Sequence, residues 1–292
     1  MKEFIVSEKN NNKKLSTVLQ DEFPGLSFNM FNKALRKKDI RINNIKTSQN
    51  SIVNSGDKIS VYITDEFLIK NSYFDISQYI IYEDDNILIV NKPNGICVKN
   101  DTKNELSLED ILTEYSHKMY SILPCHRIDR NTKGLVVFAK NENSQKEILT
   151  GFKNHNIHKK YRCLVYGIPK DNSKLLTAYL FKDSKKNIVL ISDTKKKGYI
   201  EIQTKYTVIS IDKAHNTSWL DIDLLTGKTH QIRAHLAHIG HPIIGDNKYG
   251  NKDINKSQNA KFQELTAYRI EFETKCFEKL TYLNNKTFEI KE

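Results

Sequence analysis

Residues 124–140 read PCHRIDRNTKGLVVFAK, and this stretch decides how the rest of the chain is interpreted. The run LVVFA is wholly apolar and predicts a buried strand, and Gly134 permits a tight turn just before it. Asp129 therefore lies on a loop that leads into the core, where a side chain is held in place. Three cations flank this one acid, namely Arg127, Arg130 and Lys133.

The cations decide what chemistry Asp129 can perform. Nearby guanidinium groups favour the ionised form of a carboxyl and lower its pKa. An ionised, fixed Asp can act as a nucleophile or stabilise developing positive charge, but it is a poor general acid. An isolated RxDR pattern is more often a surface salt bridge, so the pattern alone leaves catalysis and salt bridge both open.

The size and composition of the chain indicate a soluble globular protein. Its 292 residues suffice for one large domain or two smaller ones, with 38% hydrophobic and 28% charged residues. No apolar run has the length of a membrane span or of a signal-peptide core, so we expect a cytoplasmic protein without a membrane partner. The four cysteines form no CxxC pair, which favours reduced thiols over a zinc site or disulfides.

The net charge points to a polyanionic partner. It is +11, with a pI of about 9.2, which favours RNA or DNA over a membrane surface. A general bias toward Lys would raise the pI without any function, so charge alone leaves both explanations open.

The cations are concentrated near the N-terminus, where residues 32–46 hold six cations against one acid. LSTVLQDEF and LSFNMFNKAL carry apolar residues at helical spacing, whereas IRINNIK and DKISVYI alternate as strands do. Residues 15–63 are therefore predicted to form two helices followed by a small sheet. A solvated helix face explains most charge runs, but these cations also suit a phosphate backbone. The candidate RNA contacts are Lys33, Arg36, Lys37, Lys38 and Arg41.

The remainder of the chain is rich in strands. Residues 64–79 show no clean period and are interpreted as a linker or the entry to a second domain. YIIYEDDNILIVNKPNGICV predicts two strands around an acidic turn, and further strands are predicted at LVVFAK, YRCLVYG, NIVLIS, GYIEIQTKYTVIS and WLDIDLL. Helices are predicted at SLEDILTEYSHKMYS and NSQKEILTGFK. Strands that follow one another in sequence favour a mixed or antiparallel sheet over a doubly wound parallel one.

Residues 224–250, LLTGKTHQIRAHLAHIGHPIIGDNKYG, invite two interpretations that fail. A phosphate-binding loop needs a Gly five positions before Gly227, where Ile222 stands. The four histidines lack the HExxH spacing of a zinc site and would occupy different faces of a helix, so no metal is predicted. What remains is THQIR at the start of a helix, with Arg233 able to reach back toward a carboxylate.

Tyr161 is the last candidate that the residues themselves suggest. It is expected to open a strand directly after two lysines, in HKKYRCLVYG. A Tyr at a basic strand entrance can stack on a base, and it is equally often a cross-strand packing residue.

Taken in order, these segments resemble the RluA-type pseudouridine synthases. HRIDRNTKGLVVFAK is similar to that family's HRLDRDTSGLLLFAK, and YEDDNILIVNKPNGICV to its YEDDxLLVVNKPxGLxVH. TGKTHQIRAHLAHIGHPIIGDNKYG is similar to its TGRTHQIRxHLxxxGHPIxGDxxYG. FNKALRKKDIRINN with SGDKISVYI resembles the alpha-L motif, an RNA-binding module named for a small-subunit ribosomal protein. KKLSTVL departs from it where many such modules carry Arg-Leu-Asp.

The resemblance implies a reaction and a set of residues. Uridine in structured RNA would be converted to pseudouridine without cofactor or metal. Asp129 matches the family's essential aspartate, Tyr161 the tyrosine that stacks on the base, and Arg233 the basic partner of the aspartate. Ile232 falls where an apolar residue lines the pocket. The full substrate-binding set predicted is Arg127, Arg130, Lys228, His230, Gln231 and Ile232.

These inferences combine into one expectation for the whole chain. We expect an alpha-L module over residues 1–65, a linker over 66–79, and an α+β catalytic domain with a mixed, largely antiparallel sheet over 80–292. The expected partner is RNA, with large-subunit rRNA preferred to tRNA, no DNA, and a monomer as the default. Lys228 replaces the usual Arg and Thr266 the usual His, which bears on RNA preference and leaves the catalytic groups intact.

Overall fold

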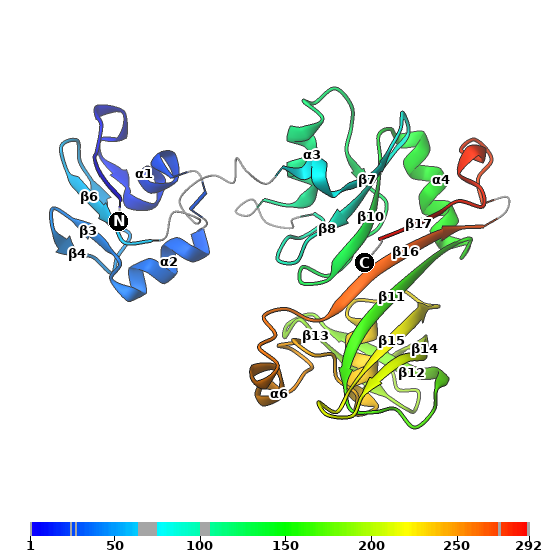
Figure 1. Cartoon of the computed structure of the whole chain (residues 1–292). Coiled ribbons are helices and arrows are strands. Elements are labelled where there is room, and N and C mark those ends of the chain that lie inside the picture. Colours follow the sequence, from blue (N-terminus) through cyan, green and yellow to red (C-terminus); the bar gives the residue numbers. More distant parts are fainter. Residues whose placement is uncertain are drawn as a thin grey trace. The chain divides into compact units, whose positions relative to one another are not determined.

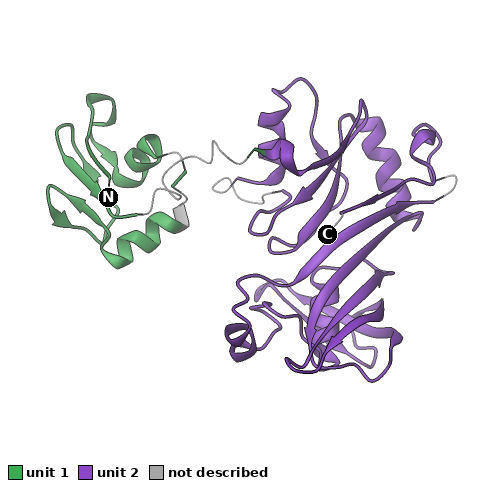
Figure 2. Cartoon of the chain, viewed as in Figure 1, with its two compact units in different colours: residues 1–75, 100–105 green, residues 76–99, 106–292 purple. Residues whose placement is uncertain are grey.

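The computed structural model describes residues 2–23, 25–26, 28–63, 75–99, 106–273 and 276–290. The chain separates into two compact units (Figure 2). Residues 1–75 belong to the first, and residues 76–99 and 106–292 to the second. The predicted linker, residues 66–79, falls mostly outside the described residues, but its last four residues form the 3-10 helix η3 (Ile76–Tyr79) of the second unit.

Among its described residues, the first unit has two α-helices and a small antiparallel sheet, as predicted for residues 15–63. Its sheet has the order β1-β6-β3-β4, and β2, which directly precedes α1, forms a separate pair with β5. β1 was not predicted and adds an edge strand to this sheet. The elements are β1 (Lys2–Ile5), η1 (Glu8–Asn10), β2 (Lys13–Lys14), α1 (Leu15–Glu22), α2 (Phe28–Lys37), β3 (Ile40–Ile42), β4 (Ile45–Lys46), β5 (Ile52–Val53) and β6 (Lys58–Val61).

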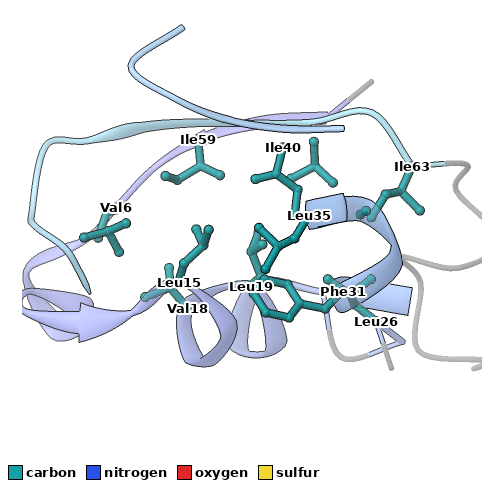
Figure 3. Close-up of a cluster of buried hydrophobic side chains, with 13 residues drawn as sticks. Val6, Leu15, Val18, Leu19, Leu26, Phe31, Leu35, Ile40, Ile59 and Ile63 are labelled. Atoms are coloured by element: carbon teal, nitrogen blue, oxygen red, sulfur yellow. The ribbon is translucent and has the colours of Figure 1, made fainter. Parts of the chain in front are cut away.

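A single apolar core holds the first unit together. Leu15 and Leu19 of α1 point toward Ile40 and Ile59 of the sheet, and all four side chains are fully buried (Figure 3). Burying each such side chain contributes about 1.5–3 kcal/mol. Asn43 and Asn44 both have positive φ and close the β3–β4 hairpin, the conformation that a two-residue hairpin turn requires. The apolar residues at helical spacing in LSTVLQDEF and LSFNMFNKAL are therefore the residues that α1 and α2 contribute to this core.

Eleven strands among the described residues of the second unit form one sheet (Figure 1). Its order is β13-β12-β14-β15-β11-β16-β10-β8-β7, with β17 beside β16 and β9 beside β10. The strands are β7 (Ile80–Glu83), β8 (Ile87–Lys92), β9 (Leu123–Pro124), β10 (Lys133–Ala139), β11 (Ile157–Tyr166), β12 (Ser173–Asp183), β13 (Ile188–Ser192), β14 (Ile200–Asp212), β15 (Thr217–Leu224), β16 (Leu265–Phe272) and β17 (Thr287–Glu289). The remaining helices are α3 (Leu108–Tyr115), α4 (Glu142–Lys153), α5 (Gln231–His238), α6 (Lys252–Ser257) and the 3-10 helix η4 (Thr281–Leu283).

The predicted α+β class with a mixed, largely antiparallel sheet is confirmed. Among the described strands only β10 and β16 pair in parallel, and every other ladder of this sheet is antiparallel. The predicted strands are present, as are the helices predicted at SLEDILTEYSHKMYS, NSQKEILTGFK and THQIR, whereas β9, β12, β16 and β17 were not predicted. The strand predicted from LVVFA, β10, is buried along nearly its whole length, and it lies inside the sheet between β8 and β16.

Gly134 serves a different purpose from the one predicted. It lies inside β10 and not in a turn before it, with φ of 124°. A Cβ at this position would collide with the backbone of Ala267 on β16. The glycine is therefore needed for the close approach of the two parallel strands, because only Gly tolerates both this φ and this contact.

Candidate active site

Asp129 lies on the loop between β9 and β10, as predicted. Its carboxylate is one-quarter exposed, so a ligand can reach it. The loop is held by Lys92, whose buried ammonium donates hydrogen bonds of 2.8–2.9 Å to the carbonyls of Pro93, Ile96 and Arg130. Burial lowers the pKa of Lys92 to about 8, and the charge of Asp129 acts in the opposite direction. The residue after Asp129 is thus anchored to the end of β8.

Arg233 joins Asp129 to a second carboxylate. Its Nη1 donates a 2.7 Å hydrogen bond to Oδ2 of Asp129. Its Nε and Nη2 donate bonds of 2.7 and 2.9 Å to the two oxygens of Asp246, which is 1% exposed. The guanidinium is thus fixed in a planar fork between two acids, the geometry that makes Arg–carboxylate pairs strong.

The charges of this array stabilise one another. Burial by itself raises the pKa of Asp246, but the hydrogen bonds from Arg233 outweigh it and hold that pKa below its ordinary value. Burial likewise opposes the charge of Arg233, yet the two acids raise the pKa of the guanidinium. Oδ1 of Asp246 also accepts bonds from the backbone N–H groups of Lys248 and Tyr249. Asp246 and Arg233 therefore both remain ionised near neutral pH.

The cation that contacts Asp129 comes from far along the chain. Arg233 is 104 residues away from it in sequence. The flanking Arg127, Arg130 and Lys133 have exposed side chains, and Nη1 of Arg130 donates to the carbonyl of Gly95 at 3.4 Å. The predicted pairing of Arg233 with a carboxylate is thus present, whereas the flanking cations face the surface around the loop.

His230 lies near the same oxygen of Asp129 that Arg233 contacts. Its Nε2 is 3.9 Å from Oδ2 of Asp129, and its Nδ1 is 2.9 Å from the hydroxyl of Tyr249. It precedes α5 in a left-handed conformation with φ of 52°, which is uncommon for a residue other than Gly. Burial lowers the pKa of His230, and the nearby Arg233 acts in the same direction.

Tyr161 lies within β11, not at its start as predicted, because the strand already begins at Ile157. The pairing of β11 with β16 shifts register between Lys160 and Tyr161, which marks a bulge at this point. The side chain is 5% exposed. Burial raises the pKa of its phenol, and the charge of Asp129 raises it further. Tyr161 is thus a protonated phenol close to Asp129.

The remaining predicted substrate contacts occupy different environments. Ile232 is buried at 5% exposure, and the Lys228 side chain is exposed. The Gln231 amide is buried and accepts from Thr226 and the Lys228 N–H while donating to β14. These bonds hold the TGK turn against the sheet, so the direct substrate contacts of Gln231 and Lys228 stay predictions.

The four histidines after Thr229 bond to four different groups. His235 contacts Thr204, His238 contacts Asp193, and His241 contacts the carbonyl of Tyr166, while His230 faces Tyr249. The described residues contain no cluster of three or more His, Cys, Asp or Glu side chains placed to hold a metal ion. Among all described residues, no helix is long and apolar enough to cross a membrane.

The sequence alone assigned no role to three residues that surround Asp129, Arg233 and His230 in the structure. Asp246 and Tyr249 lie in the GDNKYG segment that closes the quoted stretch 224–250, and Lys92 lies in VNKPNG. A buried Lys or Asp without a local partner in sequence is a signal that a distant partner exists, but the sequence does not say which one.

Comparison with known proteins reaches the same region of the chain. Residues 86–238 match the family described as RNA pseudouridylate synthase. The chain is 32% identical over 289 residues to ribosomal large subunit pseudouridine synthase C of Rickettsia felis, covering 94% of this chain and 92% of that protein. It is 33% identical over 277 residues to ribosomal large subunit pseudouridine synthase D of Buchnera aphidicola, covering 89% and 86% respectively.

Solved structures show the same fold. Human RNA pseudouridylate synthase domain containing 1 superposes with a TM-score of 0.58 at 21% identity, covering 72% of this chain and 81% of that one. Human RNA pseudouridylate synthase domain containing 4 gives 0.56 at 21% identity, covering 68% and 85%. The chain belongs to the RNA pseudouridylate synthase family. Within it, the chain is a pseudouridine synthase of the RluA type, an isomerase that acts on RNA.

Proposed function

We propose that this enzyme converts specific uridines of large-subunit rRNA to pseudouridine, with Asp129 acting at the ribose and without a cofactor. The observation that carries the proposal is the short bond between Arg233 and Asp129, which leaves one oxygen of a one-quarter-exposed carboxylate for a substrate. The rRNA assignment rests on the curated relatives named for large-subunit rRNA.

The chemistry needs an ionised carboxylate. Breaking the N1–C1′ bond builds positive charge at C1′, as in the hydrolysis of sugars. Asp129 would either attack C1′ covalently or remove the C2′ proton to give a glycal, and both routes remain open. The uracil then turns, C5 joins C1′, and the C5 proton is lost. The phenol of Tyr161 stays protonated at neutral pH, so it would relay this proton to an acceptor and not act as a ready base.

The target base must leave its helix before Asp129 can reach the sugar. Arg127 is exposed on the loop that carries Asp129, and we assign it the role of filling the space that the base vacates. Arg127→Ala should then slow turnover and weaken RNA binding, as measured by tritium release and filter binding. Full affinity and full turnover in this variant would remove the assignment.

The first unit would supply RNA affinity. Four cations are exposed on α2 and the turn after it, namely Lys33, Arg36, Lys37 and Lys38. Lys33 and Arg36 line a pocket of about 610 Å³. Arg41 stacks over the ring of Tyr62 at 4.8 Å. Phosphate contacts make binding fall steeply with salt. Removing residues 1–65 should therefore flatten the salt dependence of RNA binding, and an unchanged slope would contradict this role.

The deciding experiment is tritium release from RNA labelled at uridine C5. The wild-type protein and its Asp129→Asn variant are compared on rRNA and tRNA from cells lacking the enzyme. We expect release from large-subunit rRNA by the wild type and none by the variant. Release from tRNA alone would overturn the rRNA assignment, and undiminished release by the variant would overturn the role of Asp129. Tight binding without release would indicate an RNA-binding protein that retains the fold.

The proposal also takes the enzyme to be a cytoplasmic monomer.

A further inference from the structure

The hydroxyl of Tyr249 is placed to set the tautomer of His230. This hydroxyl accepts a 2.8 Å hydrogen bond from the backbone N–H of Val189 on β13. Its own proton then has Nδ1 of His230, 2.9 Å away, as its acceptor. An imidazole that accepts at Nδ1 carries its proton on Nε2 when neutral. The bond from Val189 to Tyr249 thus favours a neutral His230 with its proton on Nε2.

The surroundings keep this imidazole neutral. The ring faces Arg233 and Lys248 as well as Asp129 and Asp246, and its burial disfavours a charge. It also stands at the N-terminus of α5, where the helix dipole disfavours a cation.

The Nε2 of this imidazole lies close to the Asp129 carboxylate, which the proposed chemistry brings against the ribose. Nε2 is 3.9 Å from Oδ2 of Asp129, too far for a direct hydrogen bond. That oxygen is already taken by Arg233 at 2.7 Å. A sugar whose C1′ or C2′ contacts Asp129 can place its 2′-oxygen next to the Nε2–H group, for which the described residues show no hydrogen-bond partner.

We propose that His230, held as the Nε2–H tautomer by Tyr249, donates a hydrogen bond to the 2′-hydroxyl oxygen of the target nucleotide. It is a specificity-determining residue, because the 2′-hydroxyl is what distinguishes RNA from DNA at a given position. The inference rests on the proposed function, since it takes the ribose to be the group that meets Asp129. The competing explanation is that the His230–Tyr249 contact only ties α5 to β13.

A double-mutant cycle separates the two explanations. The substrates are two RNA oligonucleotides that contain the uridine modified by the wild-type protein, one with ribose and one with 2′-deoxyribose at that nucleotide. Wild type and His230→Phe are each assayed for pseudouridine formation on both. The intrinsic effect of the deoxy sugar on the chemistry is common to both proteins and cancels in the cycle.

We expect His230→Phe to lower kcat/KM about tenfold on the ribose substrate and to have little effect on the deoxy substrate. The same drop on both substrates would overturn the inference while leaving the proposed function intact. Absence of turnover by the wild type on any RNA would overturn the proposed function and the inference together.

A second pair of variants keeps the test valid if His230→Phe fails to fold. His230→Gln retains an amide donor and should recover part of the preference for ribose. Tyr249→Phe leaves the imidazole but removes the proton donor to Nδ1, so its loss of activity should also be confined to the ribose substrate. ¹⁵N NMR of the wild-type histidines provides a direct check, since a protonated Nδ1 in His230 at neutral pH would contradict the assignment.

Discussion

Replacing Asp246 by Asn tests whether the site depends on the acid behind the guanidinium. An asparagine has the same shape, so it can keep one oxygen in the place of Oδ1. Its amide nitrogen would then face the Nε–H of Arg233, a donor opposite a donor at the position of a 2.7 Å bond. The buried cation also loses one of its two counter-charges.

The magnitude follows from the burial of the pair. Asp246 is 1% exposed, and breaking a buried ion pair by neutralising one partner costs about 3–5 kcal/mol. Asp253→Asn is the matched control, because this acid is exposed on α6 and should change stability by less than about 0.5 kcal/mol. Trp219 on β15 is the one Trp of the sequence, so its fluorescence in urea reports unfolding of the second unit.

The loss should also depend on pH. The folded pKa of Asp246 lies below its ordinary value of 3.8, so its ionisation stabilises the fold above that value. This contribution disappears as the pH falls through the folded pKa, and the gap between wild type and Asp246→Asn should narrow from pH 7 toward pH 3.

Activity should fall as well, mainly in kcat, because Arg233 loses the contact that orients it toward Asp129. A fall of about tenfold or more is expected in tritium release under saturating RNA. A variant as stable as the wild type at pH 7, with unchanged kcat, would refute the reasoning. Equal destabilisation by the Asp253→Asn control would show that burial of the pair is not the cause.

Three further predictions concern the sheet and the loop. Tyr161→Phe should change stability by less than about 1 kcal/mol but lower turnover about tenfold at unchanged RNA affinity, measured by tritium release and filter binding. Gly134→Ala should cost about 3 kcal/mol or more through its collision with Ala267, whereas Gly227→Ala, with no atom within 4 Å of the new Cβ, is the control in urea denaturation. Lys92→Met leaves three carbonyls without their donor and should lower stability by about 2–4 kcal/mol at pH 7. Burial lowers the pKa of Lys92 from 10.5 to about 8, so between pH 8 and 10.5 the unfolded chain binds more protons than the folded chain. Lys92 therefore raises the free energy of unfolding of the wild type as the pH rises through this window. A wild-type stability that falls there as steeply as that of Lys92→Met would contradict the shift.

Much of the fold was predictable from local patterns. The spacing of apolar residues identified α3, α4 and the strands around Asp129, because a strand buried on both faces needs a continuous apolar run and a helix needs a periodic one. Residues 173–183 and 265–272 were not predicted as strands. Both mix charged and apolar residues, and their pairing with β14 and β11 decides their conformation.

The sequence by itself determined the class of enzyme and the residue on which the proposed chemistry rests. The loop around Asp129 and the THQIR segment are recognisable because their residue types and spacing are local. Only the tertiary structure decided that Arg233 is shared between Asp129 and Asp246, that Lys92 anchors the loop, and that Tyr249 orients His230. These contacts join segments whose separation is set by the order of strands in the sheet, and that order is a property of the whole chain that no local pattern encodes.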